Sequence, residues 1–449
     1  MEGEPDLDRL ARIGNGHGNG IGIDANQVTP ASHATLARGE GLAMHPRRFA
    51  WVLVLLLALG AAGAVDAQQA KRVAREYLAT IADDNPDPLP RGLAEVERGL
   101  PLPAPAPWTE LAPPTGAVST PPEYAHNEGL LISWGSFNSI LTELAVGITT
   151  GDPGAIVYIL VTGPSQQASA TAILQGAGAD LGQVEFITYT TNTVWIRDYG
   201  PRFISEDGHR AIVDHIYNRP RPLDDAFPDF LSALWGEPQY DLPLVHGGGN
   251  FHLFADTEAF MTELVLDENP GLTAQDVIDL YASYQGLALE ITPGFPSWYD
   301  STRHIDMWML PVRDLEVIIG EYSPGDGQPY TITEAMAAEL SARGYTLHRT
   351  PGWNAGGTHY TYTNAVVFND LVFISEFAGY PAQNAAALAV FQAAFPDHQV
   401  IPVDSSDIIH SAGAIHCIVM HVPAVGAGGL PFADGFESGD VSRWSSVVP

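Results

Sequence analysis

The sequence predicts an α/β fold for residues 121–425 of the 449-residue chain. Short apolar runs rich in β-branched residues read as strands, and helical patterns lie between several of them, as in residues 332–344 and 384–396. Strands that alternate with helices are typical of α/β architecture. The strand-like runs are GLLISW, AIVYILV, VEFITY, AIVDHIY, LEVIIGEY, AVVFNDLVFIS and AIHCIVMHV. The sixth run reads as a hairpin that turns at Asn369-Asp370, because Asn and Asp favour tight turns.

The N-terminal sequence predicts that the protein is exported. Residues 1–67 contain an upstream extension without apolar periodicity and then a stretch, residues 44–67, with the layout of a signal peptide. Two arginines precede an apolar run of fifteen residues, and Val65-Asp66-Ala67 resembles a cleavage site. The run is shorter than the ~20 residues that span a bilayer, although an uncleaved anchor stays an alternative. We expect Met44 to be the true start and the protein to be secreted or periplasmic, without stable membrane insertion after cleavage.

Two further segments lack a core-forming pattern. Residues 68–120 carry many prolines, as in PLPAPAPW, and are predicted to be a pro-segment or linker because proline fixes φ and removes backbone donors. Residues 426–449 are rich in glycine and then acidic, which predicts a flexible C-terminal tail.

Charge excludes one class of partner. The chain has 53 acidic and 20 basic residues, a formal net charge of −33. This charge repels nucleic acid and anionic membrane surfaces and favours cationic substrates, so we expect no nucleic-acid partner. The oligomeric state stays open.

Cys417 is the only cysteine. An unpaired cysteine in an exported chain is a reactive thiol, an intermolecular linker or a buried inert residue. A reactive thiolate needs an imidazole or other positive potential nearby, so the choice depends on residues elsewhere in the chain.

Two motifs supply such residues. NTVWIRDYGPRF places Asp198 before a Tyr-Gly-Pro turn, and STRHIDMWMLP contains His304 and Asp306. In an extended strand, His304 and Asp306 would point to the same face. Each carboxylate alone is more often structural, but one thiol, one imidazole and two acids together suit a planar cationic electrophile.

Other chemistries have weaker support. HGGG at His246–Gly249 resembles an esterase oxyanion-hole motif, but no G-x-S-x-G elbow accompanies it. His304-x-Asp306 or the histidines near the C-terminus could bind a cation, but no H-E-x-x-H or cysteine-pair motif exists. We therefore expect no metal and no organic cofactor.

The motifs W-x-R-D-x-G-P, H-x-D and G-x-x-H-C, in that order, resemble those of the guanidine-modifying deiminases. The chain is most similar to the bacterial peptidylarginine deiminase and agmatine deiminase family, from PPEYAHNEGLLISW to AIHCIVMHVP. The resemblance implies a pentein fold, in which five ββαβ units form an α/β propeller around a central active site. The leader, the proline-rich segment and the tail lie outside it.

The resemblance also implies residue roles. Cys417 would attack the guanidinium carbon, Asp198 and Asp306 would grip the guanidinium N–H groups, and His304 would protonate the departing ammonia and then activate water. Asn364 matches an active-site asparagine of the peptidylarginine branch and would support catalysis. Trp195 and Asn250 are expected to be pocket walls.

The stretch HIYNRPRPLDD bears on the substrate. It resembles a stretch of the secreted peptidylarginine deiminases, in which two arginines, here Arg219 and Arg221, bind the α-carboxylate of a C-terminal arginine. Agmatine has no carboxylate, and GGGNF at Gly247–Phe251 lacks the acid that agmatine deiminases tend to carry there. We therefore expect hydrolysis of C-terminal peptidyl-arginine, in peptides or proteins, to citrulline and ammonia. Agmatine deiminase, free-arginine deiminase, amidinotransferase and a binding protein without chemistry stay alternatives.

Overall fold

The computed structural model describes residues 75–103 and 112–424. The predicted extension and signal peptide, the predicted tail and part of the proline-rich segment lie outside these residues. Within the described residues, no helix combines the length and the apolar character needed to cross a membrane.

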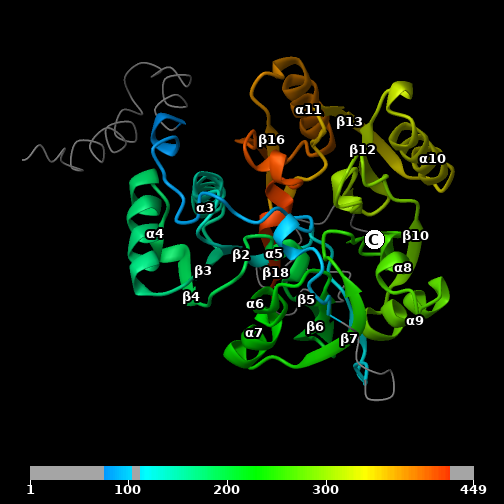
Figure 1. Cartoon of the computed structure of the whole chain (residues 1–449), viewed down its shortest axis with the longest axis horizontal. Coiled ribbons are helices and arrows are strands. Elements are labelled where there is room, and N and C mark those ends of the chain that lie inside the picture. The colour runs from blue at the N-terminus through cyan, green and yellow to red at the C-terminus, as the bar shows by residue number, and fades with distance from the viewer. Residues whose placement is uncertain (1–74, 104–111, 425–449) are drawn as a thin grey trace, which may run out of the picture. The chain divides into compact units, whose positions relative to one another are not determined.

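Five sheets of three or four strands make up the described fold. In each sheet two strands pair antiparallel and a third pairs parallel to one of them. A parallel neighbour requires a crossover connection, and helices supply it in every unit. The arrangement is five ββαβ units, so the expected α/β pentein fold is confirmed (Figure 1).

The first unit joins strands from the two ends of the folded region. Its strand order is β18-β2-β3-β4, and the last strand of the described residues, β18, pairs antiparallel with β2 through Val419–Ile132 and Met420–Leu131. This pairing closes the set of five units. The elements are β2 (Asn127–Ser133), α3 (Asn138–Gly151), β3 (Ile156–Val161), α4 (Pro164–Ala177), β4 (Val184–Thr188) and β18 (Val419–Pro423).

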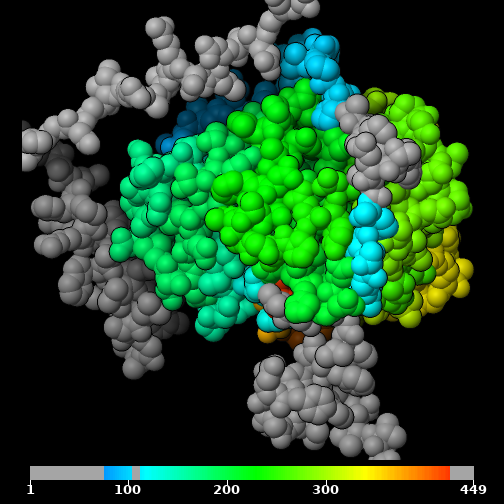
Figure 2. Space-filling model, turned by 90° about the horizontal axis from the view of Figure 1, so that it is seen from below, coloured from blue at the N-terminus to red at the C-terminus, as the bar shows by residue number. Residues whose placement is uncertain are grey.

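The second and third units follow directly. A short strand from the N-terminal side of the domain, β1, pairs with the edge strand β5, and the chain that leads into it crosses the surface as a cyan band in Figure 2. The second unit contains β1 (Val118–Ser119), β5 (Arg202–Glu206), β6 (His209–Tyr217), α6 (Pro222–Asp225), α7 (Phe227–Trp235) and β7 (Gln239–His246). The third contains β8 (His252–Leu253), β9 (Glu258–Thr262), α8 (Leu264–Glu268), α9 (Ala274–Gln285) and β10 (Ala288–Thr292).

The fourth and fifth units contain the two predicted helices and the predicted hairpin. The hairpin is confirmed: Phe368 pairs with Leu371, and Asn369 has a φ of 50°, a region that Asn tolerates well. The fourth unit contains β11 (Met309–Arg313), β12 (Glu316–Glu321), α10 (Gln328–Ala342), β13 (Thr346–Ala355) and β14 (Thr358–Thr361). The fifth contains β15 (Val366–Phe368), β16 (Leu371–Glu376), α11 (Pro381–Ala394) and β17 (Gln399–Asp404).

The strands are apolar without alternation because both of their faces are buried. In β3, Ile159 packs into one hydrophobic cluster, while Tyr158 and Leu160 pack into another with Phe203 of the second unit. A strand covered on both faces has no polar side, which explains why AIVYILV reads as a continuous apolar run.

Short connections between the units carry the candidate site residues. One connection contains the single-turn helix α5 (Ile196–Tyr199), which includes Asp198, and others contain the 3-10 helices η4 (Ile305–Met307) and η7 (Ile415–Ile418). The remaining 3-10 helices are η1 (Glu95–Glu97), η3 (Leu181–Gln183), η5 (Pro324–Asp326) and η6 (Ile408–Ser411). The extended strand expected for residues 301–311 is therefore wrong around Asp306, because a 3-10 turn precedes β11 there.

Candidate active site

Each of the five inter-unit connections delivers a residue to one buried site. Asp198 lies between β4 and β5, Gly249 between β7 and β8, His304 and Asp306 between β10 and β11, Asn364 between β14 and β15, and Cys417 between β17 and β18. Figure 1 shows α5 and β18 in the middle of the five units. The four predicted catalytic side chains are all buried.

A guanidinium group of the chain itself occupies this site. Arg91, which sequence reasoning missed, is fully buried and donates to both predicted carboxylates. Its Nε and Nη2 lie 2.9 Å from the two oxygens of Asp198, and its Nη1 and Nη2 lie 3.2 and 2.9 Å from those of Asp306. Two bidentate pairs are the geometry that carboxylates offer to a guanidinium.

Electrostatics keep both carboxylates ionised. Burial alone raises the pKa of Asp198, but the charge and the hydrogen bonds of Arg91 outweigh it, so this pKa lies well below its usual range. The pKa of Asp306 is lowered in the same way, because Arg91 and a hydrogen bond from His416 outweigh burial. Burial lowers the pKa of Arg91, but the two aspartates raise it well above its usual value. The site therefore binds a cation with two fixed negative charges.

His304 contacts the same guanidinium nitrogen as the two acids. Its Nδ1 lies 2.6 Å from Nη2 of Arg91 and 3.5 Å from Oδ1 of Asp198. Since Nη2 of Arg91 carries only N–H donors, Nδ1 is the acceptor in this contact. Gly247 makes room for this ring, because a Cβ there would lie 2.8 Å from Cε1 of His304.

Cys417 lies beside the guanidinium site. Its Sγ is 3.3 Å from Oδ1 of Asn364 and 3.9 Å from Oδ2 of Asp306, the oxygen that also accepts from Arg91. Burial raises the pKa of the thiol above its usual value, and the nearby carboxylates add to this, whereas the charge of Arg91 lowers it. A bound guanidinium therefore favours the thiolate that would attack it.

Asn364 and Asn250 differ in what they contact. Asn364 accepts from the backbone N–H of Ala414 at 3.1 Å and faces the thiol, which fits the expected supporting role. Asn250, expected to be a pocket wall, accepts instead from the backbone N–H groups of Thr262 and Ile305. It braces the connection that holds His304.

Trp195 lies beside the arginine side chain. A Cβ at Gly413 would lie 2.8 Å from the Trp195 ring, 3.0 Å from Sγ of Cys417 and 3.2 Å from Cδ of Arg91, so all three groups surround the same glycine. The indole Nε1 donates to the carbonyl of Leu89 at 2.8 Å. Trp195 therefore covers the apolar part of the bound arginine.

Arg219 and Arg221 hold the backbone around Arg91. Nη2 of Arg221 donates to the carbonyls of Pro90 and Gly92, at 2.7 and 3.1 Å. Nε of Arg219 lies 3.4 Å from the carbonyl oxygen of Arg91 itself. β6 ends at Tyr217 and Arg221 stands at the N-terminus of α6, and both side chains converge on the backbone around Arg91.

Arg221 also binds a carboxylate from within the chain. Its Nε and Nη2 lie 2.7 and 3.0 Å from the oxygens of Glu97. Burial raises the pKa of Glu97, but the hydrogen bond from Arg221 outweighs it and lowers this pKa below its usual value. Arg221 therefore binds a carboxylate in this structure, and that carboxylate belongs to Glu97.

A second charge network supports Asp306 from behind. The two ring nitrogens of His416 lie 3.0 Å from Asp306 and 2.9 Å from Glu123, and Arg197 lies 2.6 Å from Glu123. The pKa of Glu123 falls well below its usual range, because Arg197 and His416 outweigh burial. This network keeps the carboxylate of Asp306 in one orientation.

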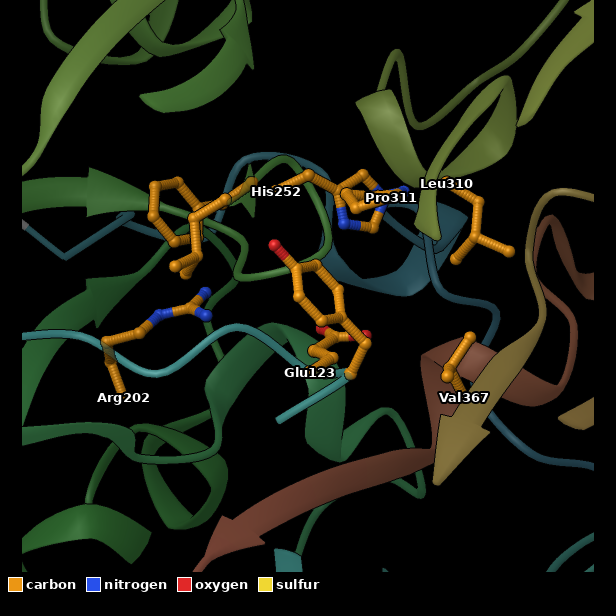
Figure 3. A pocket seen from close by; sticks show the side chains of 9 residues that line it. Glu123, Arg202, His252, Leu310, Pro311 and Val367 are labelled. Carbon is orange, nitrogen blue, oxygen red and sulfur yellow. The ribbon is translucent and has the colours of Figure 1, made fainter. Parts of the chain in front are cut away.

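A small cavity borders this network (Figure 3), with room for about one water molecule. Glu123 and His252 line it, and Arg202 lies over the ring of Phe251 at 4.2 Å. The ligand atoms of Glu123, His252 and His416 lie within 4.8 Å of one another and could hold a metal ion. His304 and Asp306, considered as cation ligands from the sequence, face a guanidinium instead.

Comparisons with known proteins agree on one family. Residues 120–423 match the model of the Porphyromonas-type peptidyl-arginine deiminase family. A protein of Streptomyces coelicolor named "Putative agmatine deiminase" is 25% identical over 344 residues, which cover 68% of this chain and 98% of the relative.

Solved structures share the fold. The C. jejuni agmatine deiminase is 18% identical with a TM-score of 0.60, over 70% of this chain and 99% of that one. A Porphyromonas gingivalis protein described as a "Putative Arginine Deiminase" is 20% identical with a TM-score of 0.60, over 68% of this chain and 98% of that one.

Proposed function

Because the chain belongs to the Porphyromonas-type peptidyl-arginine deiminase family of guanidine-modifying deiminases, we propose that it hydrolyses the guanidinium of peptidyl-arginine to citrulline and ammonia. The observation that carries this proposal is the peptide-linked arginine, Arg91, in the site. Its guanidinium lies between Asp198 and Asp306, while Arg219 and Arg221 bind carbonyls of its backbone.

The residues support a two-step reaction. Sγ of Cys417 attacks the guanidinium carbon, and the thiol proton reaches Nη2 by way of His304, so that the C–Nη2 bond breaks and ammonia leaves. The product is a cationic thiouronium on Cys417. His304 then takes one proton from water, whose oxygen attacks the same carbon. The second water proton passes to sulfur as the C–S bond breaks, which releases citrulline and the thiol, and His304 gives its proton to the released ammonia. General acid–base catalysis of this kind typically contributes ~10²–10⁴-fold in rate.

Asp198 and Asp306 contribute without changing protonation. Their low pKa values keep them charged through the cycle, so they hold the substrate cation and stabilise the cationic intermediate. None of these steps requires a metal or organic cofactor.

The arginine pair favours a substrate with a carbonyl or carboxylate beside its side chain. A C-terminal arginine would offer its α-carboxylate to Arg219 and Arg221, and the bond from Arg221 to Glu97 is a precedent for such a pair. Agmatine ends in an amine, which both guanidinium groups would repel. Agmatine deiminase is nevertheless the second candidate, because the name of the Streptomyces coelicolor relative points to that substrate.

A substrate panel tests the proposal. Citrulline-type product and ammonia are measured with a peptide that ends in arginine, a peptide with internal arginine, free arginine and agmatine. We expect the highest kcat/KM for the peptide that ends in arginine, and a clear preference for agmatine would contradict the proposal. Adding an acceptor amine separates hydrolysis from amidino transfer, since transfer would consume the amine and release no ammonia.

We also propose export to the periplasm or the medium, on the basis of residues 44–67. Mass spectrometry of the protein from fractionated cells tests this, with a new N-terminus near Gln68 as the expected result. Full-length protein confined to the cytosolic fraction would contradict it.

A further inference from the structure

The structure places Arg91 as a substrate would be placed, and we propose that Arg91 is a modification site: Cys417 deiminates it in cis, and this reaction opens the active site. The proposal rests on the proposed function, because it uses the same chemistry. It adds a substrate that belongs to the chain itself and a consequence for access to the site.

The contacts of Arg91 are those that the reaction requires. All three of its guanidinium nitrogens donate to Asp198 or Asp306, and Nη2 also faces Nδ1 of His304. Oδ2 of Asp306 lies 2.9 Å from Nη2 and 3.9 Å from Sγ of Cys417, so nucleophile and guanidinium share one neighbour. A structural ion pair would need one acid and no thiol.

The segment around Arg91 is fixed on both sides. Before it, the backbone N–H of Asn85 donates to Gly135 at 2.8 Å, and the carbonyl of Leu89 accepts from Trp195. The backbone N–H of Arg91 itself donates to Ser411 at 3.0 Å. After it, the carboxylate of Glu97 binds Arg221. The arginine therefore enters the site as an internal peptide residue, with the chain continuing in both directions.

This position excludes other substrates. The side chain of Arg91 fills the space between the two aspartates, and Glu97 takes the arginine that we assign to a substrate carboxylate. A tethered group has an effective concentration in the millimolar range, so an added peptide competes at a disadvantage.

Conversion of Arg91 would remove this block. The cationic guanidinium and one water become a neutral urea group and an ammonium ion, which carries the positive charge away, with no oxidant or other reactant. Citrulline carries no charge, so it forms no ion pair with the two aspartates, and an oxygen in place of Nη2 would lose the N–H donors that now bind both carboxylates. The segment then loses its strongest attachment to the site while Cys417 is regenerated.

The reaction is confined to one molecule because Arg91 is fully buried. Arg98 lies on the same segment, is exposed and pairs only with Glu95 among the described residues. It serves as an internal control, since a second enzyme molecule would reach Arg98 more easily than Arg91.

Mass spectrometry of proteolytic fragments tests the modification. In the full chain we expect citrulline at position 91 and arginine at position 98, and in the Cys417→Ala variant we expect arginine at both. In a mixture, active Arg91→Gln protein should leave Arg91 of the Cys417→Ala protein unchanged. If protein that converts added substrates keeps arginine at position 91, self-modification is refuted while the proposed function stands. Conversion of Arg91 in the Cys417→Ala protein of the mixture would also refute modification in cis.

Two substitutions at the same position test the consequence for access. Arg91→Lys keeps a cation between the aspartates but has no carbon to attack, whereas Arg91→Gln carries a neutral amide as citrulline does. We expect the KM for an added peptide to be roughly tenfold higher with lysine than with glutamine. Equal KM values would overturn the opening step. If neither variant converts any guanidine and Arg91 stays unmodified, the proposed function itself fails.

Discussion

Gly249 is the position where the smallest change should do the most damage to guanidinium binding. A Cβ at this glycine would lie 1.9 Å from Nη2 of Arg91, 2.7 Å from Oδ2 of Asp306 and 2.9 Å from Oδ1 of Asp198. Real Cβ contacts do not fall below 3.0 Å, so a bound guanidinium would have to move by more than 1 Å. The perturbation we consider is therefore Gly249→Ala.

The expected magnitude follows from the bonds that Nη2 would lose. It donates to one oxygen of each aspartate at 2.9 Å. Hydrogen bonds to charged groups contribute ~1.5–3 kcal/mol each, so losing both costs ~3–6 kcal/mol. This corresponds to a fall of about 10²–10⁴-fold in kcat/KM.

The assay compares kcat/KM for a peptide that ends in arginine between the two proteins, with thermal unfolding as the measure of folding. Gly271→Ala is the matched control, because a Cβ there would have no neighbour within 4 Å. We expect the control to behave as the natural chain. A Gly249→Ala protein with kcat/KM within twofold of the natural chain would refute the assigned guanidinium position.

Three further predictions concern the nucleophile, the arginine pair and a buried acid. Cys417→Ala should abolish citrulline formation with only ~1 kcal/mol lost in stability, since one sulfur is removed; residual turnover would exclude Cys417 as the nucleophile. Arg219→Ala combined with Arg221→Ala should lower kcat/KM for C-terminal arginine roughly 10–100-fold more than for agmatine, whereas equal losses would contradict the carboxylate assignment. Burial raises the pKa of Asp224 to about 7. Because this folded-state value exceeds the usual one, Asp224 stabilises the fold fully below about pH 4 and loses that contribution as the pH rises through about 7, by roughly 2–4 kcal/mol. Asp224→Asn should flatten the free energy of unfolding over this range, as urea titrations would measure; an unchanged pH profile would contradict the raised pKa.

The sequence predicted those parts of the fold that depend on local pattern. Runs such as AIVYILV are apolar throughout because both faces of β3 are buried, and the Asn369 turn follows from backbone preference. The number of units could not be counted, because β18 pairs with a strand almost 300 residues earlier and no local signal marks such a pairing.

Sequence motifs predicted four residues of the candidate site, whereas Arg91 could not be predicted from the sequence. Asp198, His304, Asp306 and Cys417 stand in recognisable spacings, and the structure brings all four together. Arg91 stands in a proline-rich stretch, where composition indicates a linker. The one available signal was its rarity, as an arginine among 20 basic residues in 449.

Residues outside the motifs join the site through long-range contacts. Glu123 reaches His416 across 293 positions of sequence, and Arg91 reaches Asp306 across 215. Residues so far apart in the sequence form no motif with a fixed spacing, so no sequence pattern predicts their contact. Their roles follow only from the folded chain.

The pairing of β18 with β2 determines when the candidate active site can assemble during synthesis and folding of the chain. The ribosome makes the segment with Arg91 early and Cys417 late, and Cys417 reaches Asp306 and Asn364 only when β18 docks against β2. A nascent or truncated chain therefore holds its acids and imidazole without a working thiol beside them. The proposed deimination therefore starts only after the ring of five units has closed.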